Sequence, residues 1–161
     1  MTAIYDFTLE NQDGQQVSLE RYRGKVLLIV NTATGCGLTP QYEALQALYD
    51  RYRSLGFEIL DIPCNQFMNQ APGTAQEINK FCKLHYGTSF PRFAKAKVNG
   101  ADAHPLYKWL KQEARGPVGK AIEWNFVKFL VDRQGKVVKR LAATSSPDKL
   151  SERIEALLKT S

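Results

Sequence analysis

The stretch Lys25–Tyr42, KVLLIVNTATGCGLTPQY, constrains the fold of this chain more than any other part of it. It begins with Val26–Val30, an unbroken apolar run rich in β-branched residues, which predicts a strand buried on both faces. A loop of small residues follows and leads to Cys36. The next residues predict the start of a helix, with Thr39 as N-cap and Pro40 at the first helical position. A cysteine is therefore expected between the end of a central strand and the start of a helix.

This position of Cys36 favours a reactive thiol. The N-terminus of a helix offers unpaired backbone N–H groups and the positive end of the helix dipole, and both stabilise an anion. Because the thiolate is the nucleophilic form of cysteine, we expect a redox-active or nucleophilic residue here. The alternative is a small buried core residue, which is the commonest environment of a free cysteine. A core cysteine would more often lie inside the strand or on an apolar helix face than in a glycine-flanked turn.

Length, composition and charge indicate one globular domain spanning residues 1–161. The chain is 43% hydrophobic and 24% charged, and it is long enough to bury a full core. We see neither the basic and apolar regions of a secretory signal nor an apolar run of membrane-spanning length. We therefore expect a cytoplasmic protein without stable membrane association. The net charge is +6, but lysine and arginine are scattered along the chain, which indicates a basic surface and no nucleic-acid site.

The three cysteines, Cys36, Cys64 and Cys82, are an odd number with neither CxxC nor metal-ligand spacing. Both histidines lie far from any cysteine motif, so we expect no metal site and no cofactor. A reducing compartment and at least one working thiol fit this pattern better than a disulfide-stapled secreted domain.

The remaining signals predict an α/β domain. An Asp-Gly turn separates two short strands near the N-terminus, and a helix and a parallel strand follow the Cys36 loop. The expected elements are strands at Ile4–Leu9, Gln16–Leu19, Phe57–Ile62, within Phe90–Val98, at Phe126–Asp132 and at Val137–Ala142, and helices at Pro40–Leu55, Thr74–Tyr86, Pro105–Glu113 and from Ser146 and Pro147 onward. This order is typical of a thioredoxin-like fold, with a central mixed β-sheet flanked by helices and an N-terminal β-hairpin extension.

In a thioredoxin-like context, the residue three positions after the reactive cysteine decides the chemistry. Here it is Thr39, so the motif is Cys-Gly-Leu-Thr and a vicinal dithiol is excluded. Any resolving thiol must come from elsewhere in the chain. Cys36 alone is suited to one-thiol chemistry, such as attack on a peroxide oxygen to give a sulfenic acid.

Three blocks of the sequence resemble the signatures of the glutathione peroxidase family and run in the family's order. They are Asn31–Thr39 (NTATGCGLT), Ile62–Gly73 (IPCNQFMNQAPG) and Glu123–Asp132 (EWNFVKFLVD), and the resemblance covers nearly the whole chain. It implies a thiol-dependent peroxidase that reduces hydrogen peroxide and organic or lipid hydroperoxides. A peroxide sensor that relays its oxidation to a partner protein is the alternative.

The resemblance also implies a catalytic site of Cys36, Gln70, Trp124 and Asn125. The two amides and the indole offer N–H donors without a full charge. Donors directed at sulfur stabilise the thiolate and then the departing hydroxide or alkoxide. Taken alone, Trp124 would be read as a core aromatic residue and Asn125 as a turn residue.

Cys82 has two interpretations. On its own it is a core cysteine on the apolar face of the Thr74–Tyr86 helix. The resemblance gives the other interpretation, because family members that use thioredoxin carry a resolving cysteine in a similar FC…YG…FP block, here Phe81-Cys82, Tyr86-Gly87 and Phe90-Pro91. It thus implies that Cys82 resolves the oxidised Cys36 and that thioredoxin, with glutathione as the alternative, is the reductant. Cys64 is expected to be structural.

The chain departs from the family pattern at a few positions outside these residues. Met68 stands where the family usually has glycine, so the backbone before Gln70 is expected to differ. The segment Ala114–Ala121 lacks the long insertion that forms the tetramer contact of longer members. The resemblance to this shorter form implies a monomer with a more open site.

Overall fold

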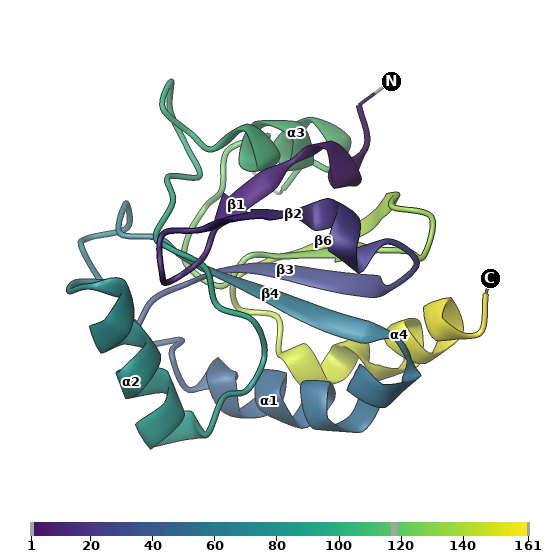
Figure 1. The fold of residues 1–161 in the computed structure, drawn as a ribbon, viewed down its shortest axis with the longest axis horizontal. Coiled ribbons are helices and arrows are strands. Elements are labelled where there is room, and N and C mark those ends of the chain that lie inside the picture. Colours follow the sequence, from purple (N-terminus) through teal and green to yellow (C-terminus); the bar gives the residue numbers. More distant parts are fainter. Residues whose placement is uncertain (1, 117–118, 161) are drawn as a thin grey trace.

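The computed structural model describes residues 2–116 and 119–160. Within these ranges the main sheet follows the strand order β4 (Phe57–Pro63), β3 (Val26–Thr32), β5 (Lys128–Val131), β6 (Val137–Leu141). Strands β3 and β4 are parallel, whereas β5 is antiparallel to both β3 and β6. The predicted mixed sheet is thus confirmed, with the strand that leads to Cys36 in its interior (Figure 1).

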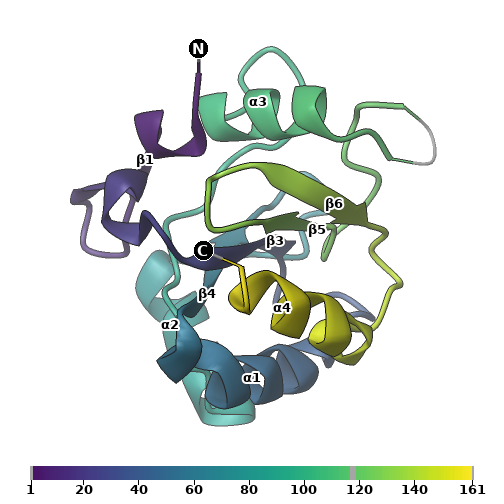
Figure 2. The ribbon, with the colours of Figure 1, turned by 90° about the vertical axis from the view of Figure 1, so that its right-hand side faces the viewer.

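Helices cover the sheet on two sides. Helices α1 (Gln41–Tyr52), α2 (Ala75–Tyr86) and α4 (Ser151–Leu158) lie on one side, which we call the α1 face. On the other side, the α3 face, lie α3 (Pro105–Glu113) and the N-terminal hairpin of β1 (Thr8–Glu10) and β2 (Gln16–Ser18) (Figure 2). This arrangement is the expected thioredoxin-like architecture with an N-terminal hairpin.

Strand β3 is buried along its whole length, as its unbroken apolar sequence predicted. Because side chains alternate along a strand, β3 contributes to two separate hydrophobic clusters. Leu28 and Val30 belong to the cluster on the α1 face, and Leu27 and Ile29 to the cluster on the α3 face. The sheet therefore separates two cores.

The predicted helix boundaries are confirmed for α2 and α3. Thr74 and Glu77 form a capping box at the start of α2, and Gly87 ends that helix in the left-handed region with φ of 60°. Helix α1 ends at Tyr52 and continues as a 3₁₀ turn, η3 (Arg53–Leu55), before Gly56, whose φ of 101° favours glycine.

One predicted strand is confirmed only in its last part, and another is wrong. The first part of Ile4–Leu9 is a 3₁₀ turn, η1 (Ile4–Asp6), because the Asp6 carboxylate accepts a hydrogen bond from the Ala3 N–H and favours a turn. The region Phe90–Val98 holds no strand and contributes isolated bridges from Arg92 and Phe93. Pro91, which lacks an N–H group, prevents a regular ladder there.

Two predicted helix starts also need correction. Helix α1 begins at Gln41, after Pro40, and the Thr39 hydroxyl does not cap this helix. The hydroxyl instead accepts a hydrogen bond from Cys36 N at 3.0 Å and donates one to the Ala33 carbonyl at 2.8 Å. Near the C-terminus, Ser146 precedes a 3₁₀ turn, η4 (Pro147–Leu150), and α4 begins only after it. None of the described helices is both long and apolar enough to cross a membrane.

Candidate active site

Cys36 lies in the loop between β3 and α1, close to the predicted position. The residue is 8% exposed and belongs to the cluster on the α1 face. The backbone N–H of Leu38 donates to its sulfur at 3.3 Å, and the loop is closed by the hydrogen bond from Cys36 N to Thr39. Cys36 is therefore a nearly buried thiol whose sulfur accepts a hydrogen bond from a backbone N–H group.

Gln70 reaches this loop from the segment that follows β4. The Gly35 N–H donates to the Gln70 carbonyl at 2.7 Å, and a Cβ atom at Gly35 would lie only 3.2 Å from the same oxygen. Glycine at this position thus allows the two loops to approach closely. The Asn65 side chain supports the Gln70 loop from within, since its carbonyl oxygen accepts from Ala71 N at 2.9 Å.

The two residues before Gln70 have an unusual backbone. Met68 and Asn69 both lie in the left-handed region, with φ of 56° and 53°. For asparagine this conformation is common, whereas for methionine it is strained. The resemblance predicts a backbone difference here because Met68 stands in place of glycine. Met68 adopts a backbone conformation that favours glycine, and the residue is 77% exposed.

Asn125 meets Gln70 at the centre of the site. Its Nδ2 donates to Gln70 Oε1 at 3.1 Å, and Asn125 is fully buried. This contact leaves the NH₂ group as the donor end of the Gln70 side chain. Trp124 is partly buried, packs against the same cluster as Cys36, and has its ring 5.5 Å from that of Phe67. The structure therefore brings Gln70 and Asn125 into contact, and Trp124 directly precedes Asn125 in the chain.

Two residues that support this region were not identified from the sequence. The Asn31 side chain donates to the Trp124 carbonyl at 3.0 Å, and the Asn31 carbonyl accepts from Phe126 N at 2.6 Å. Lys128 is fully buried and donates to the Phe126 carbonyl at 2.7 Å. The available signal was their polarity, because Asn31 ends the apolar run of β3 and Lys128 interrupts the apolar sequence around β5.

The other two cysteines lie on opposite sides of the sheet. Cys82 is fully buried on α2 and belongs to the same cluster as Cys36, on the α1 face. Cys64 is fully buried in the cluster on the α3 face. Burial raises the pKa of both thiols, that of Cys82 to about 11. Neither is therefore a nucleophile while it stays in this environment.

A buried ion pair lies near Cys82. Arg92 Nε donates to Asp61 Oδ2 at 2.8 Å, and its other nitrogens donate to Asn79 Oδ1 and Thr88 Oγ1, both at 2.8 Å. The charge of Arg92 offsets part of the rise in the pKa of Cys82 that burial causes. Because Asn79 lies on α2 and Asp61 on β4, the Arg92 side chain links the helix that carries Cys82 to the sheet.

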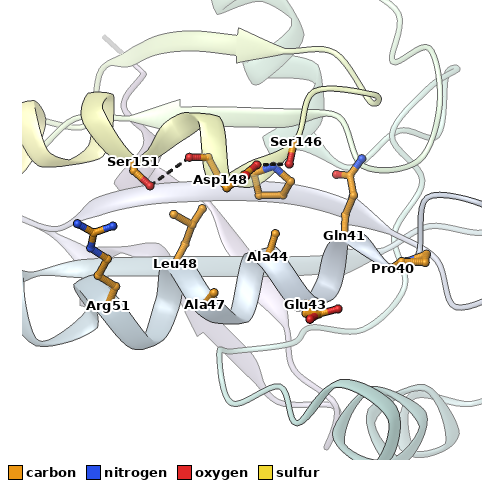
Figure 3. A pocket seen from close by; sticks show the side chains of 11 residues that line it. Pro40, Gln41, Glu43, Ala44, Ala47, Leu48, Arg51, Ser146, Asp148 and Ser151 are labelled. Carbon is orange, nitrogen blue, oxygen red and sulfur yellow. Dashed lines mark hydrogen bonds between the residues drawn. The ribbon is translucent and has the colours of Figure 1, made fainter.

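A groove of about 530 Å³ runs between α1 and η4 (Figure 3). Ala44, Leu48 and Pro147 form much of its apolar floor, and Arg51 and Asp148 line it as well. Cys36 and Gln70 do not line this groove, so it is separate from the candidate site. Among the described residues, no three His, Cys, Asp or Glu side chains gather where they could hold a metal ion.

The fold defines the class of protein as thioredoxin-like. A thioredoxin-family thiol:disulfide interchange protein from Chlorobium tepidum superposes with a TM-score of 0.69 at 18% identity, over 94% of this chain and 92% of its own. At that identity the likeness concerns the fold alone. The crystal structure of T. cruzi GPX1 is more similar, with a TM-score of 0.81 and 38% identity over 98% of this chain and 97% of its own.

The family follows from sequence comparisons. The family model "Glutathione peroxidase" matches residues 4–111. A glutathione peroxidase from Lactococcus lactis is 51% identical over 96% of this chain and 99% of its own, and the hydroperoxy fatty acid reductase gpx1 from Synechocystis is 52% identical over 96% and 95%. The glutathione peroxidase-like peroxiredoxin HYR1 from Saccharomyces cerevisiae is 48% identical over 99% and 98%. The chain belongs to the glutathione peroxidase family and is a peroxidase of the oxidoreductase class.

Proposed function

We propose that this protein reduces hydrogen peroxide and organic or lipid hydroperoxides through Cys36, with Cys82 as the resolving thiol and thioredoxin as the reductant. The observation that carries the proposal is the hydrogen bond from Gly35 in the Cys36 loop to the Gln70 carbonyl. The Gln70 side chain also accepts a hydrogen bond from Asn125. These contacts connect the Cys36 loop to the Gln70 segment and to Asn125, and the Gln70, Trp124 and Asn125 side chains offer uncharged N–H donors.

In the first step, the Cys36 thiolate attacks one oxygen of the hydroperoxide and the O–O bond breaks. The sulfur becomes a sulfenic acid, and the other oxygen leaves as hydroxide or alkoxide and takes up a proton to form water or an alcohol. The Leu38 N–H stabilises the thiolate, and the Gln70, Trp124 and Asn125 donors stabilise charge on the leaving oxygen.

In the second step, the Cys82 thiol condenses with the sulfenic acid, releasing water and forming a Cys36–Cys82 disulfide. Both residues contribute to the core on the α1 face, whereas Cys64 lies across the sheet, and this favours Cys82 as the partner. Cys82 is buried within α2, and the proposed mechanism includes an opening of this helix that lets the two sulfurs meet in disulfide geometry. A dithiol reductant then restores both thiols by exchange.

The relatives and the charge of the chain support the proposed substrate and reductant. The Synechocystis relative is named for reduction of hydroperoxy fatty acids, and the yeast relative is named a peroxiredoxin. The net charge of +6 suits docking of an acidic protein reductant. A monomeric, cytoplasmic protein remains part of the proposal.

The test is a steady-state peroxidase assay with each reductant in turn. We expect sustained consumption of hydrogen peroxide and of a fatty acid hydroperoxide when thioredoxin, its reductase and NADPH are supplied, and slower turnover with glutathione. Sustained turnover with glutathione and none with thioredoxin would contradict the proposed reductant. A single round of oxidation with no turnover under any reductant would favour the alternative, a peroxide sensor that relays oxidation to a partner protein.

A further inference from the structure

The segment Trp124–Phe126 holds Asn125 in a strained turn. Phe126 has a φ of 69°, in the left-handed region that a bulky side chain rarely adopts. Asn125 precedes it directly and donates to Gln70. If Phe126 relaxed to an ordinary conformation, the peptide after Asn125 would rotate and the Asn125 amide would leave Gln70. Some other group must therefore hold the turn in place.

Three hydrogen bonds hold the backbone on the two sides of Asn125 and after Phe126. Two come from Asn31, which bonds the Trp124 carbonyl through its side chain and Phe126 N through its backbone. The third comes from Lys128 Nζ, which donates to the Phe126 carbonyl at 2.7 Å. Lys128 Nζ also donates to the Ala143 carbonyl at 3.2 Å, and that carbonyl accepts from Gln41 Nε2 at 2.8 Å. Lys128 thus ties the turn to the segment before η4 and, through it, to the start of α1.

Burying the Lys128 ammonium group costs free energy, which indicates that this residue does more than fill the core. The residue is fully buried, and no ion pair between it and a carboxylate occurs within residues 2–116 and 119–160. Burial lowers the pKa of Lys128 to about 8, although the negative charge of Glu123 acts in the opposite direction. A leucine or methionine at this position would fill the core without that cost. What an apolar residue could not supply is the pair of donors to the two carbonyls.

We infer that Lys128 is a positioning residue of the peroxidase site: its ammonium fixes the left-handed Phe126 turn and thereby aims Asn125 at Gln70. The inference rests on the proposed role of Asn125 in the reaction. It predicts that removing the two donors slows the step in which peroxide oxidises Cys36, even though Lys128 touches neither Cys36 nor peroxide.

The test measures single-turnover oxidation of reduced enzyme by peroxide in four variants. Lys128→Met should slow this step on the order of tenfold, toward the rate of Asn125→Ala. Lys128→Arg, which keeps donors that can reach both carbonyls, should recover most of the rate. The double variant of Lys128→Met with Asn125→Ala should be no slower than Asn125→Ala alone, because Lys128 acts through Asn125. Should Lys128→Met fail to fold, Lys128→Leu, which also lacks both donors, carries the same comparison.

Phe129→Leu is the matched control. Phe129 is a fully buried neighbour on β5 that belongs to the cluster on the α3 face, so its variant should melt earlier yet keep the wild-type rate of peroxide oxidation. A wild-type rate in Lys128→Met, or a double variant that multiplies the two single effects, overturns the inference about Lys128 while leaving the proposed function intact. A wild-type rate in Asn125→Ala overturns the proposed role of Asn125 and the inference that rests on it.

Discussion

The surroundings of Cys36 and Cys82 differ although both residues belong to the same core. Cys36 lies in a loop of small residues, with a backbone N–H at its sulfur and with Gly35 of the same loop bonded to the Gln70 carbonyl. Cys82 lies in the middle of a capped helix, fully buried, beside a buried ion pair, and its pKa is raised to about 11. The environment of Cys36 therefore suits a reactive thiol, whereas burial within α2 keeps the Cys82 thiol unreactive.

This difference suits a reaction in two steps. Attack on peroxide needs a thiolate that is stabilised before the substrate arrives. Resolution needs a second thiol that stays unreactive until the first is oxidised, since an exposed low-pKa thiol would itself be oxidised. Under the proposed mechanism, a buried Cys82 requires α2 to open once in every catalytic cycle.

The largest effect is expected at Cys36. Cys36→Ser should abolish consumption of peroxide, because an unactivated hydroxyl is a far poorer nucleophile than a thiolate at neutral pH. Stopped-flow measurement of peroxide with excess reduced protein checks this. Single-turnover oxidation that survived in Cys36→Ser would show that another thiol reacts first and would remove the distinction between the two cysteines.

Cys82→Ser should separate the two steps. We expect the first oxidation of Cys36 to proceed at the wild-type rate and turnover with thioredoxin to stop, with Cys36 passing on to sulfinic acid. A coupled NADPH assay and intact-protein mass spectrometry follow the two outcomes. Cys64→Ser is the matched control, since Cys64 lies across the sheet and its loss should leave turnover unchanged. Thioredoxin-driven turnover that continued in Cys82→Ser would refute its role as the resolving thiol.

The donors around Cys36 should have intermediate effects. Replacing Gln70, Trp124 or Asn125 singly with alanine should slow the peroxide step by roughly tenfold to a thousandfold, the range for loss of one donor in an active site. The effects need not add, because the residues act as a unit. Single-turnover rates measure them directly. Wild-type rates in all three variants would mean that the amides and the indole are structural.

Arg92→Met should act on Cys82 and leave Cys36 unaffected. Removing one partner of a buried ion pair destabilises a protein by about 3–5 kcal/mol, and here it also releases Asn79 of α2 from the sheet. We expect faster hydrogen exchange over residues 75–88 and faster disulfide formation, with the first oxidation unchanged. Arg23→Met, which removes an exposed pair with Glu20, should change none of these. Unchanged exchange in folded Arg92→Met would show that the ion pair does not hold α2 closed.

Much of the fold was predictable because the relevant signals are local. The buried strand, the capped α2 helix and Pro105–Glu113 follow from periodicity, capping residues and glycine positions. Errors arose where a hydrogen bond with a nearby side chain changed the local backbone structure. Asp6 turned the start of an expected strand into a 3₁₀ turn, and Thr39 bonded within the Cys36 loop and so did not cap α1.

The candidate site was predictable only as a set of residues. The signature blocks identified Gln70, Trp124 and Asn125, and the structure adds the bond between the two amides. The supporting contacts of Asn31 and Lys128 depend on the strained backbone of Phe126, which no local pattern reveals. That Cys82 and Cys64 lie on opposite faces depends on how α2 packs, which is likewise a tertiary property.

The most direct test of the central claim is to map the disulfide formed when the reduced protein receives one equivalent of hydroperoxide and no reductant. After alkylation of free thiols and proteolysis, mass spectrometry should find Cys36 joined to Cys82 and Cys64 alkylated. Hydrogen exchange over residues 75–86 should be faster in that oxidised protein, because α2 must open to form the bond. A bridge between Cys36 and Cys64, or a Cys36–Cys82 bridge with α2 as protected as in the reduced protein, would contradict the account.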